Sequence, residues 1–381
     1  MRILLVPTQD YIHHPVPSRY HRIFEILADR HEIHVPHFHV SRGEARSTKL
    51  RVHEATLFPV ESPAIHYIIN APYHYHVLGQ VVRDYDIDVV VNCNVLAGTA
   101  VTSAARAAHI PVLFDLADWL PDSAAAYYTD PVLRWLLRES VLRITKSNLT
   151  NSDAILTVSP GLVLKLSRLG YHAGLITNGV DTDLFRPSDD EVRAIRQGLG
   201  IGADDFVIGF AGSIERWYAL HDVMKAFKKL LEYHSRLKLL IVGCSLFTDY
   251  MKQLTMLARS LKIDDKVIFT GAVPYCELPS YINAMDVCLI PLAPKEWANI
   301  ALPNKFFEYS ACCRPILSTR IPDVMEIGGP QLFVYDDYDD FVEVVRGLIE
   351  HPQKFKVDCD CYSWRHRAEE FEKVLSGLVE T

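Results

Sequence analysis

Residues 178–187, NGVDTDLFRP, separate two series of short apolar segments and decide the fold. Before this stretch, apolar runs alternate with longer amphipathic segments, and after it the same alternation starts again. Alternation of strands and helices predicts parallel sheets covered by helices on both faces. We therefore expect an α/β protein made of two Rossmann-like, doubly wound lobes that face each other across a cleft.

The expected strands are short and end at turn-forming or helical sequence. They are residues 3–6, 32–35, 89–92, 112–115, 154–158 and 174–177 in the first lobe, and residues 207–210, 237–242, 267–270, 287–291 and 315–318 in the second. Apolar residues spaced along one face of residues 362–378 predict a C-terminal helix that packs on another element.

Composition excludes several classes of protein. The 381 residues are 49% hydrophobic and 23% charged, which is typical of a globular protein with two or three domains. The apolar runs fall short of the roughly 20 residues that a membrane span needs. A net charge of −8 argues against nucleic-acid binding. Eight cysteines without a C-x-x-C pair, and no signal-peptide core at the N-terminus, indicate reduced thiols and a cytoplasmic protein.

The loops that follow strands are where parallel sheets bind ligands. No G-x-G-x-x-G follows the first strand, so a dehydrogenase is disfavoured. After the strand at 207–210, Gly212 permits close backbone approach. Ser213 and Arg216 offer a hydroxyl and a guanidinium to phosphate oxygens, and solvated loop residues are the alternative reading.

Residues 291–315 contain the richest set of candidates. Pro303 suits the first position of a helix, whose free N–H groups would point into the cleft. Lys305 in the first turn could share an anion with those N–H groups. Glu308, one turn after Asn304, could accept hydrogen bonds from the two hydroxyls of a ribose. A solvated helix face is the alternative for each residue.

Two features of the first lobe have competing interpretations. Ser18 is expected to cap a helix over residues 18–29 and, with Arg19, to aim donors at an anion, unless it only caps a surface helix. The four histidines between residues 31 and 39 could bind a metal, but their alternation with apolar residues is more typical of the solvent-facing side of a strand. We expect no bound metal.

The chain resembles the GT-B glycosyltransferases, most closely the retaining family four. The resemblance is carried by residues 154–162 with 176–187, by residues 208–213, and by residues 269–274, 278–281 and 286–292 joined to 303–315. It implies transfer of a sugar from a nucleoside-diphosphate sugar with retention at the anomeric carbon. It also implies that helix dipole and cations neutralise the diphosphate, with no divalent metal.

The resemblance places the family's ribose-binding glutamate on Glu308. It places the diphosphate near Gly212, Ser213 and the helix start at Leu302 to Lys305, which includes Pro303 and Asn304. It implies that catalysis consists mostly of stabilising the departing diphosphate, a role that we assign to Lys305 and Arg216.

In the first lobe, the resemblance implies an acceptor site. Asp118 follows the strand at 112–115, where the family keeps a residue near the acceptor and the reacting sugar. We expect Asp118 to orient the acceptor hydroxyl, with helix N-capping as the alternative. His14 and Arg19 are expected to face the acceptor or the donor phosphate.

The chain departs from the family pattern in two respects. Ile300 stands where the first of two glutamates often lies, and Glu296 is a candidate replacement. Ser213 stands where an arginine is expected, and Trp217 and Tyr218 lie near the position of a lysine, so Arg216 is the candidate for one of these cations.

The resemblance also suggests how the chain is divided. The expected parts are an acceptor-binding lobe at 1–178, a linker at 179–190, a donor lobe at 191–358 and a helix at 359–381 that packs back on the first lobe. The expected partners are the nucleoside-diphosphate sugar and a glycan, lipid-linked or small-molecule acceptor. A basic cluster at Arg42, Arg46, Lys49 and Arg51 is a weak indication of peripheral membrane contact.

Two other functions fit the same scaffold. A two-lobe sugar-nucleotide epimerase would release a nucleotide sugar and consume no acceptor. A catalytically silent scaffold would bind the nucleotide sugar without turnover.

Overall fold

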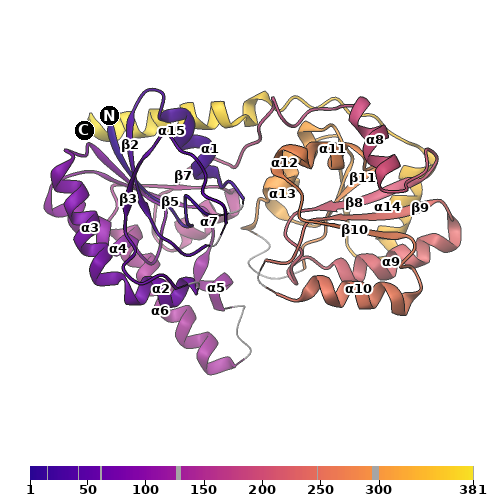
Figure 1. Cartoon of the computed structure of the whole chain (residues 1–381), viewed down its shortest axis with the longest axis horizontal. Helices are drawn as coiled ribbons and strands as arrows, with labels where there is room; N and C mark the ends of the chain where they lie inside the picture. The colour runs from indigo at the N-terminus through magenta and orange to yellow at the C-terminus, as the bar shows by residue number, and fades with distance from the viewer. Residues whose placement is uncertain are drawn as a thin grey trace. The chain divides into compact units, whose positions relative to one another are not determined.

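A computed structural model of the chain describes residues 1–14, 16–41, 43–60, 62–125, 130–246, 248–293 and 300–380, apart from the side chains at 64, 190 and 191. It divides into two compact units, Met1–Thr177 with Trp364–Thr381 and Asn178–Ser363. Each unit is built on one parallel sheet with helices on both faces (Figure 1), which confirms the expected fold class. None of the helices within the described ranges combines the length and the apolar character that crossing a membrane requires.

Unit 1 contains a seven-stranded sheet in the order β3-β2-β1-β4-β5-β6-β7, with every neighbouring pair parallel. Its strands are β1 (Arg2–Val6), β2 (Glu32–His37), β3 (Arg51–Glu54), β4 (Val89–Asn92), β5 (Val112–Leu116), β6 (Ala154–Thr157) and β7 (Gly174–Leu175). Its helices are α1 (Arg19–Leu27), α2 (Pro63–Ile69), α3 (Ala71–Asp84), α4 (Gly98–Ala107), α5 (Leu120–Ala125), α6 (Pro131–Thr150), α7 (Pro160–Arg168) and α15 (Trp364–Val379).

The sheet of unit 1 is buried on both faces because its central strands are continuously apolar. Successive side chains of a strand point to opposite faces. In β1, Leu5 joins a core formed with α1 and α15, and Leu4 joins a second core formed with α3 and α4. Helix α15 lies along α1 (Figure 1), where the rings of Phe24 and Phe371 meet edge to face at 5.5 Å.

Unit 2 contains a six-stranded sheet in the order β10-β9-β8-β11-β12-β13, again with parallel pairs. Its strands are β8 (Phe206–Ala211), β9 (Leu237–Val242), β10 (Val267–Gly271), β11 (Val287–Ile290), β12 (Ile316–Thr319) and β13 (Leu332–Tyr335). Its helices are α8 (Asp190–Gly198), α9 (Leu220–Tyr233), α10 (Tyr250–Leu261), η1 (Tyr275–Glu277), α11 (Leu278–Asn283), α12 (Asn304–Ala311), α13 (Pro322–Ile327), α14 (Tyr338–Glu350) and η3 (Asp360–Tyr362).

The sequence does not predict β3 or β13, which lie at the edges of the two sheets. Strand β3 has the sequence RVHE, and charged side chains are typical of edge strands because they discourage pairing with other chains. Such a strand lacks the apolar pattern on which strand prediction depends.

The expectation that the histidines between residues 31 and 39 face solvent is wrong for those in β2. His34 and His37 are 0% and 9% exposed, because β2 is an inner strand between β1 and β3. These rings are buried among polar partners.

Candidate functional site

The candidate site in unit 2 lies where the strand order reverses. Strand β8 pairs with β9 on one side and with β11 on the other, and ligands of such sheets bind beyond the carboxyl ends of the strands at this point. The loops after β8 and β11 are joined there. The Ala219 N–H donates to the Pro291 carbonyl at 2.7 Å, and the Ala293 N–H donates to the Trp217 carbonyl at 2.7 Å.

Two glycines let the backbone pack closely at the ends of β8 and β9. Gly212 has a φ of 139° and Gly243 a φ of 127°, backbone conformations that residues with a Cβ rarely adopt. A Cβ on Gly243 would lie 2.0 Å from the Gly212 carbonyl oxygen, and a Cβ on Gly212 would lie 3.1 Å from Lys305 Nζ. Ser213 follows and is half-buried. The Lys305 ammonium therefore occupies the space next to Gly212 that a side chain at this position would fill.

Lys305 is a buried cation with an unusual set of neighbours. It is 7% exposed, and its Nζ donates to the Tyr218 hydroxyl at 2.6 Å. The ammonium also lies 4.1 Å from the centre of the Tyr218 ring and 5.0 Å from that of Phe210. Among the residues that the structure describes, no carboxylate forms an ion pair with Lys305. A cation in this setting attracts an anionic ligand.

Helix α12 presents Lys305 at its second residue. Pro303 is the N-cap, with φ −70° and ψ 140°, and Asn304 is the first helical residue, so the expectation that Pro303 begins the helix is wrong by one position. Asn304 is exposed. The Tyr309 hydroxyl accepts the Ala211 N–H at 2.9 Å, which fixes α12 against the end of β8.

Glu308 lies on α12, one turn after Lys305, and is half-buried. Its Oε1 accepts a hydrogen bond from the Tyr275 hydroxyl at 3.3 Å, and the Tyr275 ring packs on Phe185 at 5.4 Å. The carboxylate is therefore oriented by a side chain that is itself packed. Helix α12 carries both Lys305 and Glu308, and Lys305 reaches Gly212 at the end of β8, so the structure brings these three residues together.

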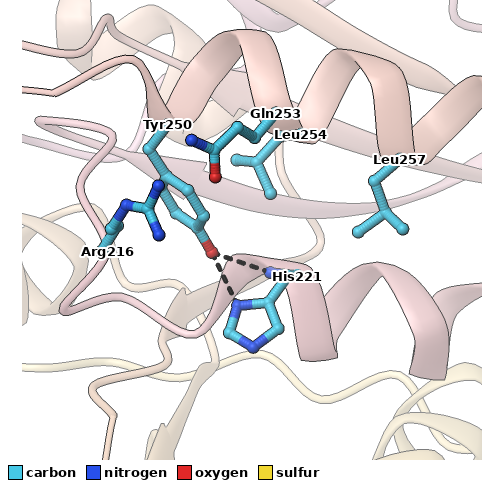
Figure 2. Close-up of a pocket in the computed structure, with 6 residues that line it drawn as sticks. All are labelled: Arg216, His221, Tyr250, Gln253, Leu254 and Leu257. Carbon is cyan, nitrogen blue, oxygen red and sulfur yellow. Dashed lines mark hydrogen bonds between the residues drawn. The ribbon is translucent and has the colours of Figure 1, made fainter.

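Arg216 lies apart from this group. Its side chain is 60% exposed and is 3.8 Å from the Asp249 carboxylate. Figure 2 shows it beside the Tyr250 ring, whose hydroxyl is hydrogen-bonded to His221. These residues line a cavity of about 510 Å³ with Gln253, Leu254 and Leu257. No contact joins Arg216 to Lys305 among the described residues.

Sequence reasoning missed Glu215, which shapes the same region. Its side chain is fully buried, and its two oxygens accept hydrogen bonds from the Leu246 N–H and the Thr248 hydroxyl, both at 2.7 Å. The carboxylate thereby holds the loop between β9 and α10. A lone glutamate in a loop gives no sequence pattern that separates this role from a solvated one.

Asp118 follows β5 in unit 1 and is exposed to solvent. Protein atoms packed around it nevertheless raise the pKa of its carboxyl to about 6. Within the described ranges, its carboxylate accepts no capping hydrogen bond from α5. Asp118 thus lies at the carboxyl end of the sheet, and within the described part of the chain its carboxylate has no hydrogen-bond partner.

Arg19 does not present its charge to a ligand, which corrects the expectation that it faces an acceptor or a phosphate. Its side chain is 3% exposed, its Nε lies 3.2 Å from the Asp115 carboxylate, and its Nη1 donates to the Ile176 carbonyl at 3.0 Å. Burial raises the pKa of Asp115, and the guanidinium opposes this shift. The pair is structural, because the first residue of α1 faces the interior.

Ser18 is the N-cap of α1, as expected, but its partner is a histidine. The Ser18 N–H donates to His21 Nδ1 at 3.0 Å, and His21 Nε2 donates to the Tyr11 carbonyl at 2.8 Å. This arrangement requires the neutral ring, and burial lowers the pKa of His21 to about 4. His14 is half-buried, and its Nδ1 lies 2.8 Å from the Val16 carbonyl. Burial lowers the pKa of His14.

Glu296, the candidate replacement for the missing glutamate, and Arg42 of the basic cluster lie outside the described residues. The other basic residues of the cluster have partners within unit 1. Lys49 pairs with Asp29 at 2.6 Å and Arg51 with Glu32 at 2.7 Å.

Two family models match the chain. A model described as glycosyl transferases group 1 matches residues 205–351, and one described as glycosyl transferase 4-like domain matches residues 17–179. Together they account for well over half of the sequence.

Curated relatives carry glycosyltransferase names. The chain is 26% identical over 265 residues to a D-inositol 3-phosphate glycosyltransferase of Corynebacterium jeikeium, covering 62% of this chain and 60% of the relative. It is 27% identical over 217 residues to a GDP-mannose-dependent alpha-(1-6)-phosphatidylinositol monomannoside mannosyltransferase of Mycolicibacterium smegmatis, covering 53% and 56%. The matches span less than two thirds of either relative's length.

Solved structures share the fold over the whole chain. Sucrose-phosphate synthase from Thermosynechococcus elongatus superposes with a TM-score of 0.80 at 16% identity, covering 99% of this chain and 98% of that one. Anabaena HepE in complex with UDP and glucose gives 0.77 at 18% identity, covering 99% and 100%.

Proposed function

Because the chain belongs to the family-four glycosyltransferases of the GT-B fold, we propose that it transfers a sugar from a nucleoside-diphosphate sugar to an acceptor hydroxyl, with retention of configuration at the anomeric carbon. The observation that carries the proposal is the buried Lys305, a cation without a carboxylate partner among the described residues.

A buried charge is costly unless it is paired. The Tyr218 hydroxyl and two aromatic faces compensate Lys305 only in part, since a hydroxyl and a ring carry no net negative charge. A diphosphate supplies the missing negative charge. At the start of a helix, the first backbone N–H groups have no partner within the helix and are all aligned along its axis. Anions bind at such helix starts, and α12 begins next to Lys305.

The remaining roles are proposed for residues of the loop after β8 and of α12, the two segments that meet at Lys305. We assign Gly212, Ser213, Pro303 and Asn304 to the diphosphate, and Glu308 to the ribose hydroxyls, because the Tyr275 hydroxyl already orients its carboxylate. Arg216 would reach the diphosphate by leaving Asp249. The two charges are exposed and 3.8 Å apart, so breaking this ion pair costs the fold little free energy.

In the proposed reaction, the bond between the anomeric carbon and the diphosphate oxygen breaks, and a bond to the acceptor oxygen forms on the same face. The acceptor proton goes to the leaving phosphate oxygen. Lys305 and the α12 donors stabilise the charge that develops on the diphosphate, so the transfer requires no metal ion. Asp118 accepts a hydrogen bond from the acceptor hydroxyl and orients it.

For the acceptor, we propose a glycan, a lipid-linked sugar or a small-molecule alcohol. The names of the two relatives point to the last two classes, since one names an inositol phosphate and the other a mannosylated phosphatidylinositol. We also propose a cytoplasmic enzyme that touches the membrane when the acceptor is a lipid. Exposed apolar side chains at the start of α6 support this contact, with Val132 66% and Trp135 61% exposed. Co-sedimentation with vesicles should fall in Trp135→Ser, and unchanged sedimentation would contradict this contact.

The test of the function is a product analysis. The protein is incubated with UDP-, GDP- and ADP-sugars, with and without a panel of glycan and lipid-linked acceptors, and nucleoside diphosphate and sugar products are separated. Nucleoside diphosphate that accumulates with a glycosylated acceptor supports the proposal. Conversion into another nucleotide sugar without an acceptor would identify an epimerase, and donor binding without any product would identify a silent scaffold.

A further inference from the structure

A cluster of metal-ligating side chains lies in unit 1, whereas the residues of the proposed donor site belong to unit 2. Asp10 follows β1, His37 ends β2 and Glu54 ends β3, and these three strands are neighbours in the sheet. Because parallel strands end at the same edge, residues that are far apart in the sequence meet there. His13, from the same loop as Asp10, completes the group.

Three atoms of this cluster form a nearly equilateral triangle. His13 Nδ1 and His37 Nε2 are 3.1 Å apart, and they lie 3.6 Å and 3.5 Å from Asp10 Oδ1. Zinc binds nitrogen and oxygen ligands at about 2.0–2.2 Å, so tetrahedral ligands are separated by about 3.3–3.6 Å. The triangle therefore has the size of three of the four ligand positions around one tetrahedral ion.

The donor atoms are held in place by partners beyond the triangle. His37 Nδ1 donates to Glu54 Oε2 at 2.8 Å, which directs the other ring nitrogen to the centre of the triangle. A carboxylate behind a histidine ligand is the usual way in which proteins orient that ligand toward a metal. The Asp10 carboxylate accepts N–H groups of Ile12, His13, Val40 and Ser41 at 2.9–3.2 Å.

Burial and charge also suit a cation. Asp10 is fully buried and the His37 side chain is 11% exposed, whereas that of His13 is 19% exposed and leaves an approach from solvent. The charges of Asp10 and Glu54 together balance one divalent ion bound by neutral rings. Two imidazoles and one carboxylate are ligands that Zn²⁺ and similar divalent transition metals prefer.

We propose that Asp10, His13 and His37 bind one divalent transition-metal ion of the zinc class, with Glu54 orienting His37 and a water molecule in the fourth position. The ion ties the loop after β1 to the end of β2. It is structural, and the proposal does not depend on the glycosyl transfer.

The same unit contains a matched control. His34 Nδ1 and His53 Nε2 are 2.8 Å apart, their rings stack at 5.1 Å, and Glu32 is bonded to the other nitrogen of His34 at 3.1 Å. This second pair of histidines has no carboxylate oxygen close to both facing nitrogens among the described residues, so only the first cluster shares a common centre.

The experiment uses the whole chain without an affinity tag, stripped with EDTA and titrated with Zn²⁺ against a chelating dye, and with Co²⁺ while visible absorption is recorded. We expect one ion per chain, the intense visible bands of tetrahedral Co²⁺, and affinity at least about tenfold lower in His13→Ala and His37→Gln than in His53→Ala. Zn²⁺ should raise the midpoint of thermal unfolding of the wild type and of His53→Ala only.

Three results would overturn the proposal. They are no uptake by the wild type, uptake that His13→Ala leaves unchanged, and an equal loss of affinity in His53→Ala. Circular dichroism melts in EDTA identify any variant that does not fold. His13→Ala changes the most exposed of the three ligands and carries the test if His37→Gln unfolds.

Discussion

Replacing Lys305 with methionine should weaken donor binding without weakening the fold. Methionine keeps most of the aliphatic stem that packs beside Phe210 and removes only the ammonium. The lost ammonium is the group that we assign to the diphosphate. Because the charge has no carboxylate partner among the described residues, its removal leaves no buried anion behind.

The size of the effect follows from these contacts. A hydrogen bond to a charged group contributes about 1.5–3 kcal/mol. At about 1.36 kcal/mol per factor of ten, the dissociation constant for a nucleoside diphosphate should rise about 10- to 150-fold. The free energy of unfolding should fall by less than about 1.5 kcal/mol, because the swap nearly conserves the volume of a side chain that is 7% exposed.

Calorimetric titration with UDP, GDP and ADP and with the parent nucleosides measures the dissociation constants. Urea unfolding measures the free energy of unfolding. Lys252→Met, at an exposed position on α10, is the matched control. Loss of diphosphate binding with unchanged nucleoside binding is expected. Diphosphate affinity within threefold of the wild type, or an equal loss for the nucleoside, would refute the assignment of Lys305.

Glu308→Ala should weaken nucleoside diphosphate binding about tenfold but leave inorganic pyrophosphate binding unchanged, since Glu308 is assigned to the ribose. An equal loss of affinity for the two ligands in competition binding would contradict this assignment. Gly243→Ala should lower the free energy of unfolding by about 2 kcal/mol or more, because its φ is 127° and its Cβ would meet the Gly212 carbonyl at 2.0 Å; an unchanged urea midpoint would be inconsistent with that clash. The pKa of His21 is lowered from 6.5 to about 4, so between these pH values the unfolded chain binds more protons than the folded chain. The free energy of unfolding therefore falls as the pH decreases from 6.5 to 4, by up to about 3 kcal/mol. His21→Gln should flatten that dependence in urea titrations at pH 7 and pH 5, and parallel curves for the two proteins would argue against a buried neutral ring.

The fold class could be predicted because burial of both sheet faces leaves continuous apolar strands. Residues 89–92 and 237–242 end where the structure ends β4 and β9. The edge strands β3 and β13 were missed, since β3 is mostly polar, and β13 is a short apolar run next to a helix.

Side-chain partners were harder to predict than strands. Arg19 has the same sequence context whether it faces a phosphate or the buried Asp115, and only the packing of α1 decides between them. The histidines of β2 alternate with apolar residues as a solvent-facing strand does, but β3 covers that edge. Tyr218, in the loop after β8, contacts Lys305 on α12, which is 87 residues away in the sequence, and no local pattern reveals this contact.

The discontinuity of unit 1 has a consequence for biosynthesis. Residues 1–177 leave the ribosome well before α15, which supplies Trp364, Ala368, Phe371 and Leu375 to the core beside α1. Residues 178–363 are contiguous, so the second half of the chain has all of its own core before the first half does. Until the final helix emerges, the part of this core that α15 covers beside α1 stays exposed, and we expect chaperones that bind apolar surfaces to act on this chain during translation.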